Sequence, residues 1–97
     1  MKNTSIALLT STNYFQWKSH MEYLLRSKGL YRITLGTETT PTDDEAKVAK
    51  WDNKNDEACD SIRMSTFPKL RFHIYGLYSP IEAWEKLHSV FGLKNEI

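Results

Sequence analysis

Apolar side chains recur at helical spacing in several stretches of this chain, with polar side chains between them. In the first stretch the repeat of three and four residues places five side chains on one stripe of a helix: Tyr14, Trp17, Met21, Leu24 and Leu25. Thr12 or Asn13 can supply the oxygen that caps its start, and Gly29 can adopt the left-handed conformation that ends a helix. The pattern predicts a helix over residues 13–28.

The longest predicted helix covers residues 43–64. Thr42 and Glu45 stand three residues apart, the spacing of a capping box, with further acidic residues in the first turn. Its apolar stripe consists of Val48, Trp51, Ala58 and Ile62, with Cys59 beside it. Lysines alternate with acidic residues on the other faces, which is typical of a helix surface in water.

Two shorter helices are predicted in the last third of the chain. Pro68 can start a helix over residues 68–76, with Leu70 in the core. Ser79 and Pro80 mark the start of a helix over residues 80–91, with serine as cap and proline at the first position. Its core side chains are Trp84, Leu87 and Phe91, and we expect Gly92 to end it as Gly29 ends the first helix.

The remaining segments complete a single domain over residues 1–97. Residues 1–11 form an arm that we expect to dock on the core or on a neighbouring copy, and residues 30–40 fit either a short strand or a helical turn with an irregular loop. Residues 93–97 contain no helix-stop signal, as in a chain cut from a longer one. The sequence predicts an all-α bundle of about four to five helices whose three tryptophans meet in one core.

The composition limits the cellular compartments and the classes of partner that we expect for this protein. Thirteen basic and twelve acidic residues give a net charge of +1, so no polyanionic partner is demanded. Cys59 is the only cysteine, which excludes an internal disulfide and fits a reducing compartment. The sequence has neither a secretory signal nor an apolar run long enough to span a membrane. We therefore expect a cytoplasmic protein without a membrane partner.

No arrangement of residues predicts catalysis, a metal site or a cofactor site. The three histidines and Cys59 are too scattered for metal-ligand spacing. Neither a Gly-x-Ser-x-Gly turn nor a glycine-rich phosphate loop occurs. Neighbouring carboxylates such as Asp56 and Glu57 diverge on a helix and cannot share a substrate. We expect a protein that is not an enzyme.

Two surfaces are candidates for binding. Apolar residues outside the core stripes are candidates for an interface between copies: Ile6, Leu8, Phe15, Tyr23, Tyr75 and Tyr78. Basic residues with aromatic neighbours are candidates for weak RNA contact: Lys18, Arg26, Lys28, Arg32, Lys69 and Arg71. The basic residues are dispersed and the net charge is close to zero, so ordinary solvation is the simpler interpretation of the second group.

The order of these motifs resembles the N-terminal, capsid-like part of the Gag polyprotein of plant copia-type LTR retrotransposons. The resemblance runs from about residue 8 to residue 96. Its first part is Asn13-Tyr14, Trp17, Met21 and Leu24-Leu25, followed by Lys28-Gly29-Leu30. Its later parts are Lys50-Trp51, Ala58, Ile62 and then Ala83-Trp84, Leu87 and Phe91-Gly92.

This resemblance implies a non-catalytic structural domain that self-associates or assembles into virus-like particles around the RNA of the element. The expected partners are further copies or full-length Gag. Members of the family often carry a Cys-Cys-His-Cys zinc knuckle that binds RNA, and this chain has no such motif. RNA binding is therefore expected to be weak or absent. The alternative is a truncated or domesticated Gag-derived module that binds a host protein or interferes with Gag assembly.

Overall fold

The computed structural model describes residues 7–92 and confirms the all-α prediction. Its elements, in chain order, are α1 (Tyr14–Ser27), α2 (Tyr31–Leu35), α3 (Glu45–Met64), the 3₁₀ helix η1 (Pro68–Ile74), α4 (Pro80–Leu87) and the π-helical turn η2 (His88–Gly92). Residues 30–40 adopt the helical alternative, as α2 and a loop. The helix predicted over residues 68–76 is of the 3₁₀ type, and the last one changes to π-helical winding after Leu87.

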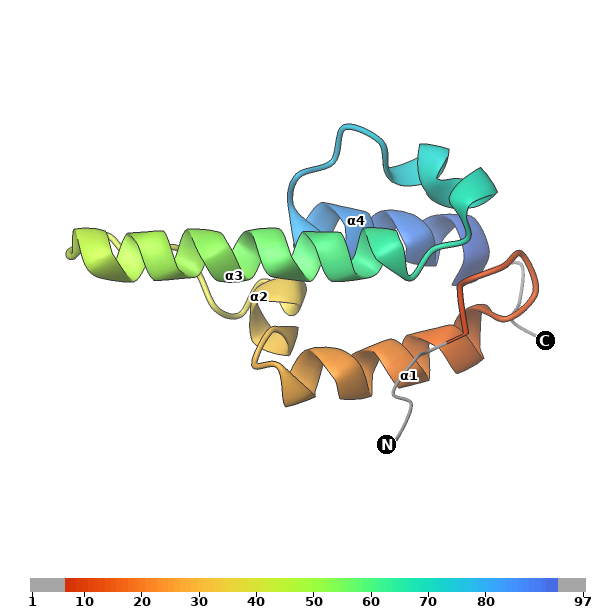
Figure 1. Ribbon diagram of the computed structural model, residues 1–97, viewed down its shortest axis with the longest axis horizontal. Helices are drawn as coiled ribbons and strands as arrows, with labels where there is room; N and C mark the ends of the chain where they lie inside the picture. The colour runs from red at the N-terminus through yellow and green to blue at the C-terminus, as the bar shows by residue number, and fades with distance from the viewer. Residues whose placement is uncertain (1–6, 93–97) are drawn as a thin grey trace.

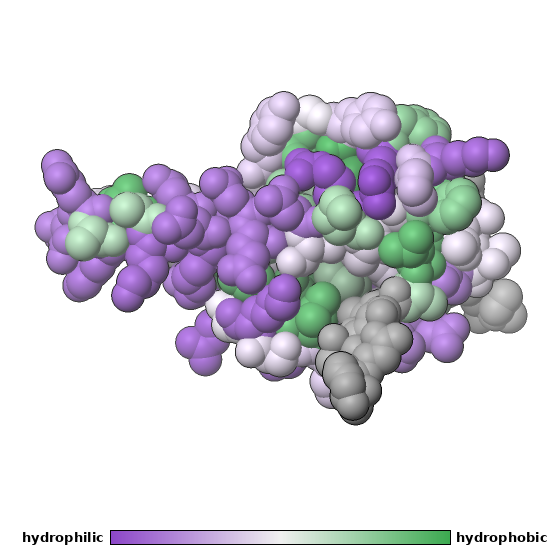
Figure 2. All heavy atoms as spheres, viewed as in Figure 1, coloured by the Kyte–Doolittle hydropathy of each residue, from purple (hydrophilic) through white to green (hydrophobic). Residues whose placement is uncertain are grey.

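Helix α3 crosses the molecule, with α1 on one side and α4 and η1 on the other (Figure 1). Helix α4 packs against α2, α3, η1 and η2, while α1 packs mainly against α2 and η2. The N-terminal part of α3 extends beyond the other helices (Figure 1), and its surface is mostly hydrophilic, with a few hydrophobic residues near its tip (Figure 2). The globular part of the fold therefore gathers around the C-terminal half of α3.

The C-terminal cap of α1 forms as predicted from the sequence, and the predicted N-terminal cap does not. Gly29 has a φ of +72°, and the backbone N–H groups of Gly29 and Leu30 donate to the carbonyls of Arg26 and Leu25, which closes the helix as predicted. At the other end, Asn13 occupies the cap position, but its side chain does not cap the helix. Its Oδ1 instead accepts a hydrogen bond from the Thr10 N–H at 2.7 Å, which ties down the preceding arm.

Two further cap predictions were wrong. Asp44, not Thr42, caps α3, and its Oδ1 accepts a hydrogen bond from the Ala46 N–H at 2.8 Å. Gly92 is not a left-handed terminator. It is buried against the His88 ring, where an added Cβ would lie 2.8 Å from Nδ1, so its small size serves packing. Ser79 does cap α4 as predicted, because its Oγ accepts from the Glu82 N–H at 3.4 Å.

The arm before α1 is held by the end of α3. The Leu9 N–H donates to the Ser65 carbonyl at 2.8 Å, and the Phe67 N–H donates to the Leu9 carbonyl at 3.0 Å, forming an isolated parallel bridge. The Trp17 indole N–H also donates to the Ser65 carbonyl, at 3.0 Å. Leu9 is fully buried. The arm thus contributes Leu9 to the core, while Ser11 and Thr12 remain exposed.

Most of the side chains predicted for the core are buried in one cluster: Tyr14, Trp17, Met21, Leu25, Ala58, Ile62, Trp84, Leu87 and Phe91. Leu24, Trp51 and Leu70 are only partly buried and pack against its margin. The cluster also contains Ala83, on the apolar face predicted for the last helix, and Leu9, Leu30, Ile33 and Ile74, which are not among the predicted core side chains. Cys59 is buried, as its small apolar character suggested.

Val48 was placed in the core by its spacing, and the structure corrects this. It is partly exposed and lies outside the core cluster, because it belongs to the part of α3 that extends beyond the other helices. Trp51 is likewise not part of a tryptophan cluster. Only Trp17 and Trp84 meet, with ring centroids 5.7 Å apart. The indole of Trp51 turns to the loop after α2.

Candidate functional site

Exposed apolar side chains are the most prominent surface feature of the fold. Five of them are more than half exposed: Tyr78 (76%), Tyr23 (73%), Tyr75 (68%), Met64 (63%) and Phe72 (58%). Of the residues predicted for an interface, Leu8, Phe15, Tyr23, Tyr75 and Tyr78 are all exposed, and Ile6 lies outside the described residues. Burial of such side chains against another chain would remove large apolar areas from water.

The segment of residues 61–81 carries a concentration of these side chains that the sequence analysis missed. Met64, Phe67 and Phe72 are exposed there, in addition to Tyr75 and Tyr78. No acidic residue occurs in this segment, whereas Arg63, Lys69 and Arg71 do. The signal was visible in the sequence as an acid-free, aromatic stretch.

A groove of about 650 Å³ opens between α1 and α3. Leu8, Leu24 and Met64 supply its apolar surface. Asp56, Glu57 and Asp60 line it from α3, and Lys28 from the end of α1. The groove is therefore apolar with an acidic border on the side of α3. Sequence spacing gave no indication of it, because its walls come from three separate segments.

A second hollow lies on the opposite side of Asp56 and Asp60, beneath the loop that follows η1. Tyr75 and Tyr78 line it together with Cys59 and Arg63. The Cys59 Sγ lies 3.5 Å from the Leu77 carbonyl, to which it donates. Burial raises the pKa of the Cys59 thiol, Asp60 and Asp56 add to the increase, and Arg63 opposes it. Cys59 is thus held as a neutral thiol rather than as a reactive thiolate.

The basic residues proposed for RNA contact fall into two separate groups. Arg26 and Arg32 line a shallow pocket at the end of α1, with Lys54 and Glu38. The guanidinium of Arg26 lies 4.4 Å from the centre of the Tyr31 ring. Lys28 forms an exposed ion pair of 3.8 Å with Glu57. Lys18 lies nearer the start of α1 and is half-buried.

Lys69 and Arg71 lie on η1, which packs on the other side of α3 (Figure 1). The Arg71 side chain is used within the fold, because its Nε donates to the Thr66 carbonyl at 2.9 Å and its Nη2 to the Met64 carbonyl at 3.5 Å. It thereby satisfies carbonyls at the C-terminal end of α3. The structure does not bring the six basic side chains together on one face.

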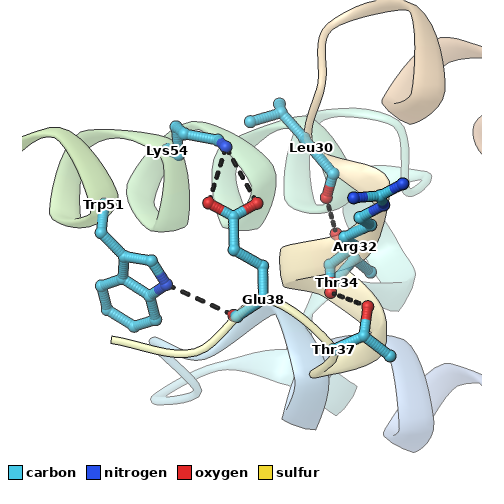
Figure 3. Close-up of polar contacts among 7 residues, drawn as sticks. All are labelled: Leu30, Arg32, Thr34, Thr37, Glu38, Trp51 and Lys54. Carbon is cyan, nitrogen blue, oxygen red and sulfur yellow. Dashed lines mark hydrogen bonds and ion pairs between the residues drawn. The ribbon is translucent and has the colours of Figure 1, made fainter. Parts of the chain in front are cut away.

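A polar cluster ties the loop after α2 to α3 (Figure 3). The Lys54 Nζ donates to both carboxylate oxygens of Glu38, at 2.9 and 2.8 Å, and the Trp51 indole N–H donates to the Glu38 carbonyl at 3.3 Å. Thr37 and Thr34 donate to carbonyls within the α2 segment, those of Arg32 and Leu30 (Figure 3). These contacts fix the loop, and they account for the position of Trp51 outside the tryptophan pair.

Tyr14 joins the start of α1 to the start of η2. Its hydroxyl lies 3.1 Å from His88 Nδ1, within hydrogen-bond distance. Burial raises the pKa of Tyr14 to about 12, and the negative charge of Glu22 adds to the increase. The phenol therefore stays protonated at neutral pH. This pair closes the fold between the first and last described helices.

Within residues 7–92, no three His, Cys, Asp or Glu side chains converge as a metal site. None of the helices in that range is long and apolar enough to cross a bilayer. No family model, curated protein or solved structure matches the chain. The candidate sites are therefore the exposed apolar surface and the α1–α3 groove, as the geometry defines them.

Proposed function

We propose that this chain is a structural, non-catalytic domain that associates with copies of itself, as the capsid-like part of a copia-type retrotransposon Gag does. The observation that carries the proposal is the set of apolar side chains exposed on the surface, above all Tyr23, Met64, Phe72, Tyr75 and Tyr78. A helical domain that repeats weak contacts through such side chains can build a closed assembly without an enzymatic site.

The positions of the residues shared with the Gag pattern support the proposal. Tyr14, Trp17 and Met21 come from its first motif, Ala58 and Ile62 from its middle one. These side chains share one core cluster with those of the last motif: Ala83, Trp84, Leu87 and Phe91. Most residues that carry the resemblance therefore lie together in the core of this fold. Its partners would be further copies or full-length Gag, in the cytoplasm.

The proposal is tested by electron microscopy of the purified chain at high concentration, together with a variant in which Tyr75 and Tyr78 are both replaced by serine. Both rings are exposed, so the variant should fold like the wild type, which circular dichroism can verify. We expect regular assemblies from the wild type and fewer or none from the variant. Single dispersed chains in both samples would contradict the proposal.

A further inference from the structure

Among residues 7–92, the α1–α3 groove has an apolar surface that no described side chain covers completely. Met64 is more than half exposed, and Leu8 also remains exposed. Leu24 is only partly covered by the core. The groove lies at the surface beside the core that α1 and α3 share, and Leu8, Leu24 and Met64 form its apolar lining. The groove has the form that accepts an apolar side chain from a partner.

Negative charge borders this groove along α3. Glu57 is paired with Lys28 at 3.8 Å, and Asp60 with Arg63 at 2.8 Å. Asp56 is exposed and forms no ion pair with a described residue. A partner that places a positive charge beside an apolar group would therefore complement the groove in both respects.

The same chain carries such a surface on η1. In a 3₁₀ helix, side chains three residues apart eclipse one another, so Lys69 and Phe72 lie on one edge of η1. Both are exposed, and Lys69 has no ion pair among the described residues. The neighbouring basic group, Arg71, is turned to the end of α3. The edge thus presents one positive charge beside one aromatic ring.

This edge lies away from α1, which forms one wall of the groove in its own chain. Helix η1 packs against α4, and Figure 1 shows it on the opposite side of α3 from α1. The two complementary surfaces therefore belong to elements on opposite sides of α3. A contact between them joins two copies, and its two halves are different patches. Such a heterologous contact leaves a free groove and a free edge at the ends, so it can repeat into a ring or an open chain.

We infer that the Lys69–Phe72 edge of one copy docks in the α1–α3 groove of a second copy, with Lys69 beside Asp56 and the Phe72 ring on Leu8, Leu24 and Met64. This inference rests on the proposed self-association and names the surfaces that carry it. The contact is heterologous, and its strength depends on ionic strength because one charge pair borders it.

The test is a charge exchange measured by sedimentation equilibrium. Asp56→Lys and Lys69→Glu each place like charges across the contact, and each should raise the dissociation constant of self-association about tenfold. An equimolar mixture of the two variants should restore most of the affinity, because the lysine in the groove of one then meets the glutamate on η1 of the other. Phe72→Ser should weaken self-association in the wild-type background.

Matched controls separate this contact from effects of net charge. Asp52 is one turn before Asp56 on α3, and Lys50 is on the same helix; both are exposed and neither lines the groove. The control variants Asp52→Lys and Lys50→Glu should therefore associate like the wild type. Circular dichroism checks that every variant is folded.

The docking inference is wrong, while self-association stands, if the wild type associates but Asp56→Lys or Lys69→Glu does not weaken the association. The same holds if mixing the two variants does not restore the affinity. Equal weakening by the controls would also overturn the docking inference. A wild type that stays monomeric overturns both.

Discussion

The indole rings of Trp17 and Trp84 lie with their centroids 5.7 Å apart and their planes inclined by 38°. This contact joins α1 to α4, the first and last α-helices of the described fold. Tyr14 packs against Trp17 on one side, and Tyr31 packs edge-on against Trp84 on the other. Both indoles are buried. The pair therefore connects α1 and α4 through the core.

Truncation of either ring should destabilise the fold strongly. We expect Trp17→Ala and Trp84→Ala each to lower the free energy of unfolding by about 3 to 5 kcal/mol, because each leaves a large cavity in a small core. Trp51→Ala is the matched comparison and should cost clearly less, since Trp51 is only partly buried. Denaturant unfolding followed by circular dichroism measures all three. Equal losses at the three positions would contradict the assignment of the core.

The start of α3 offers a test of cap geometry. Asp44→Ala should lower the free energy of unfolding by about 1 kcal/mol, because it removes the oxygen that accepts the Ala46 N–H. Thr42→Ala should have little effect, since Thr42 precedes the cap position. Thermal unfolding of the two variants separates the alternatives. A larger loss for Thr42→Ala would restore the cap expected from sequence.

The cap of α4 can be tested in the same way. Ser79→Ala should cost about 1 kcal/mol through the lost hydrogen bond to the Glu82 N–H. Ser79→Asp should retain most of the stability, because a carboxylate can accept the same hydrogen bond and favours the positive end of the helix dipole. An alanine variant that unfolds at the wild-type temperature would show that Ser79 does not stabilise the helix.

The raised pKa of Tyr14 leads us to expect a loss of stability at alkaline pH. Its pKa is raised from 10.0 to about 12 in the folded chain. Below pH 10 both states keep the phenol proton, and the contribution to stability is fully present. As the pH rises from 10 towards 12 the unfolded chain ionises first, so the free energy of unfolding falls, by roughly 2 to 3 kcal/mol for the full shift.

The matched variant for this prediction is Tyr14→Phe. It removes the ionisable group, so its stability should fall less steeply above pH 10. It should also be less stable by about 1 kcal/mol below that pH, because the contact with His88 is lost. A residual decline remains because burial also raises the pKa of Tyr31 and Cys59. Denaturant unfolding at a series of pH values gives the comparison, and identical slopes for wild type and variant would contradict it.

Local sequence signals determined much of the fold. The stripe through Trp17 and Met21, the closing turn at Gly29 and the serine cap at Ser79 all lie where residue spacing and cap chemistry place them. Such signals depend on neighbours within one or two helical turns, which the sequence displays directly.

Tertiary context decided the rest. Val48 and Ile62 share one apolar stripe, yet only Ile62 meets the core, because no other helix accompanies the first turns of α3. The sequence does not distinguish the three tryptophans, because each lies on the apolar stripe of a predicted helix. In the structure the indole N–H of Trp51 donates to the Glu38 carbonyl, which holds this ring away from the other two. The α1–α3 groove combines Leu8, Leu24 and Met64 from distant segments, so no spacing rule could have assembled it.

Self-association is the central claim, and the mass of the wild-type chain in solution tests it most directly. Light scattering after size exclusion, over a wide range of loading concentrations, should give a mass that rises above the 11.3 kDa of one chain as concentration increases. The rise should diminish when salt is added if the pair of Asp56 and Lys69 contributes to the contact. A mass that remains that of one chain at every concentration would contradict the account.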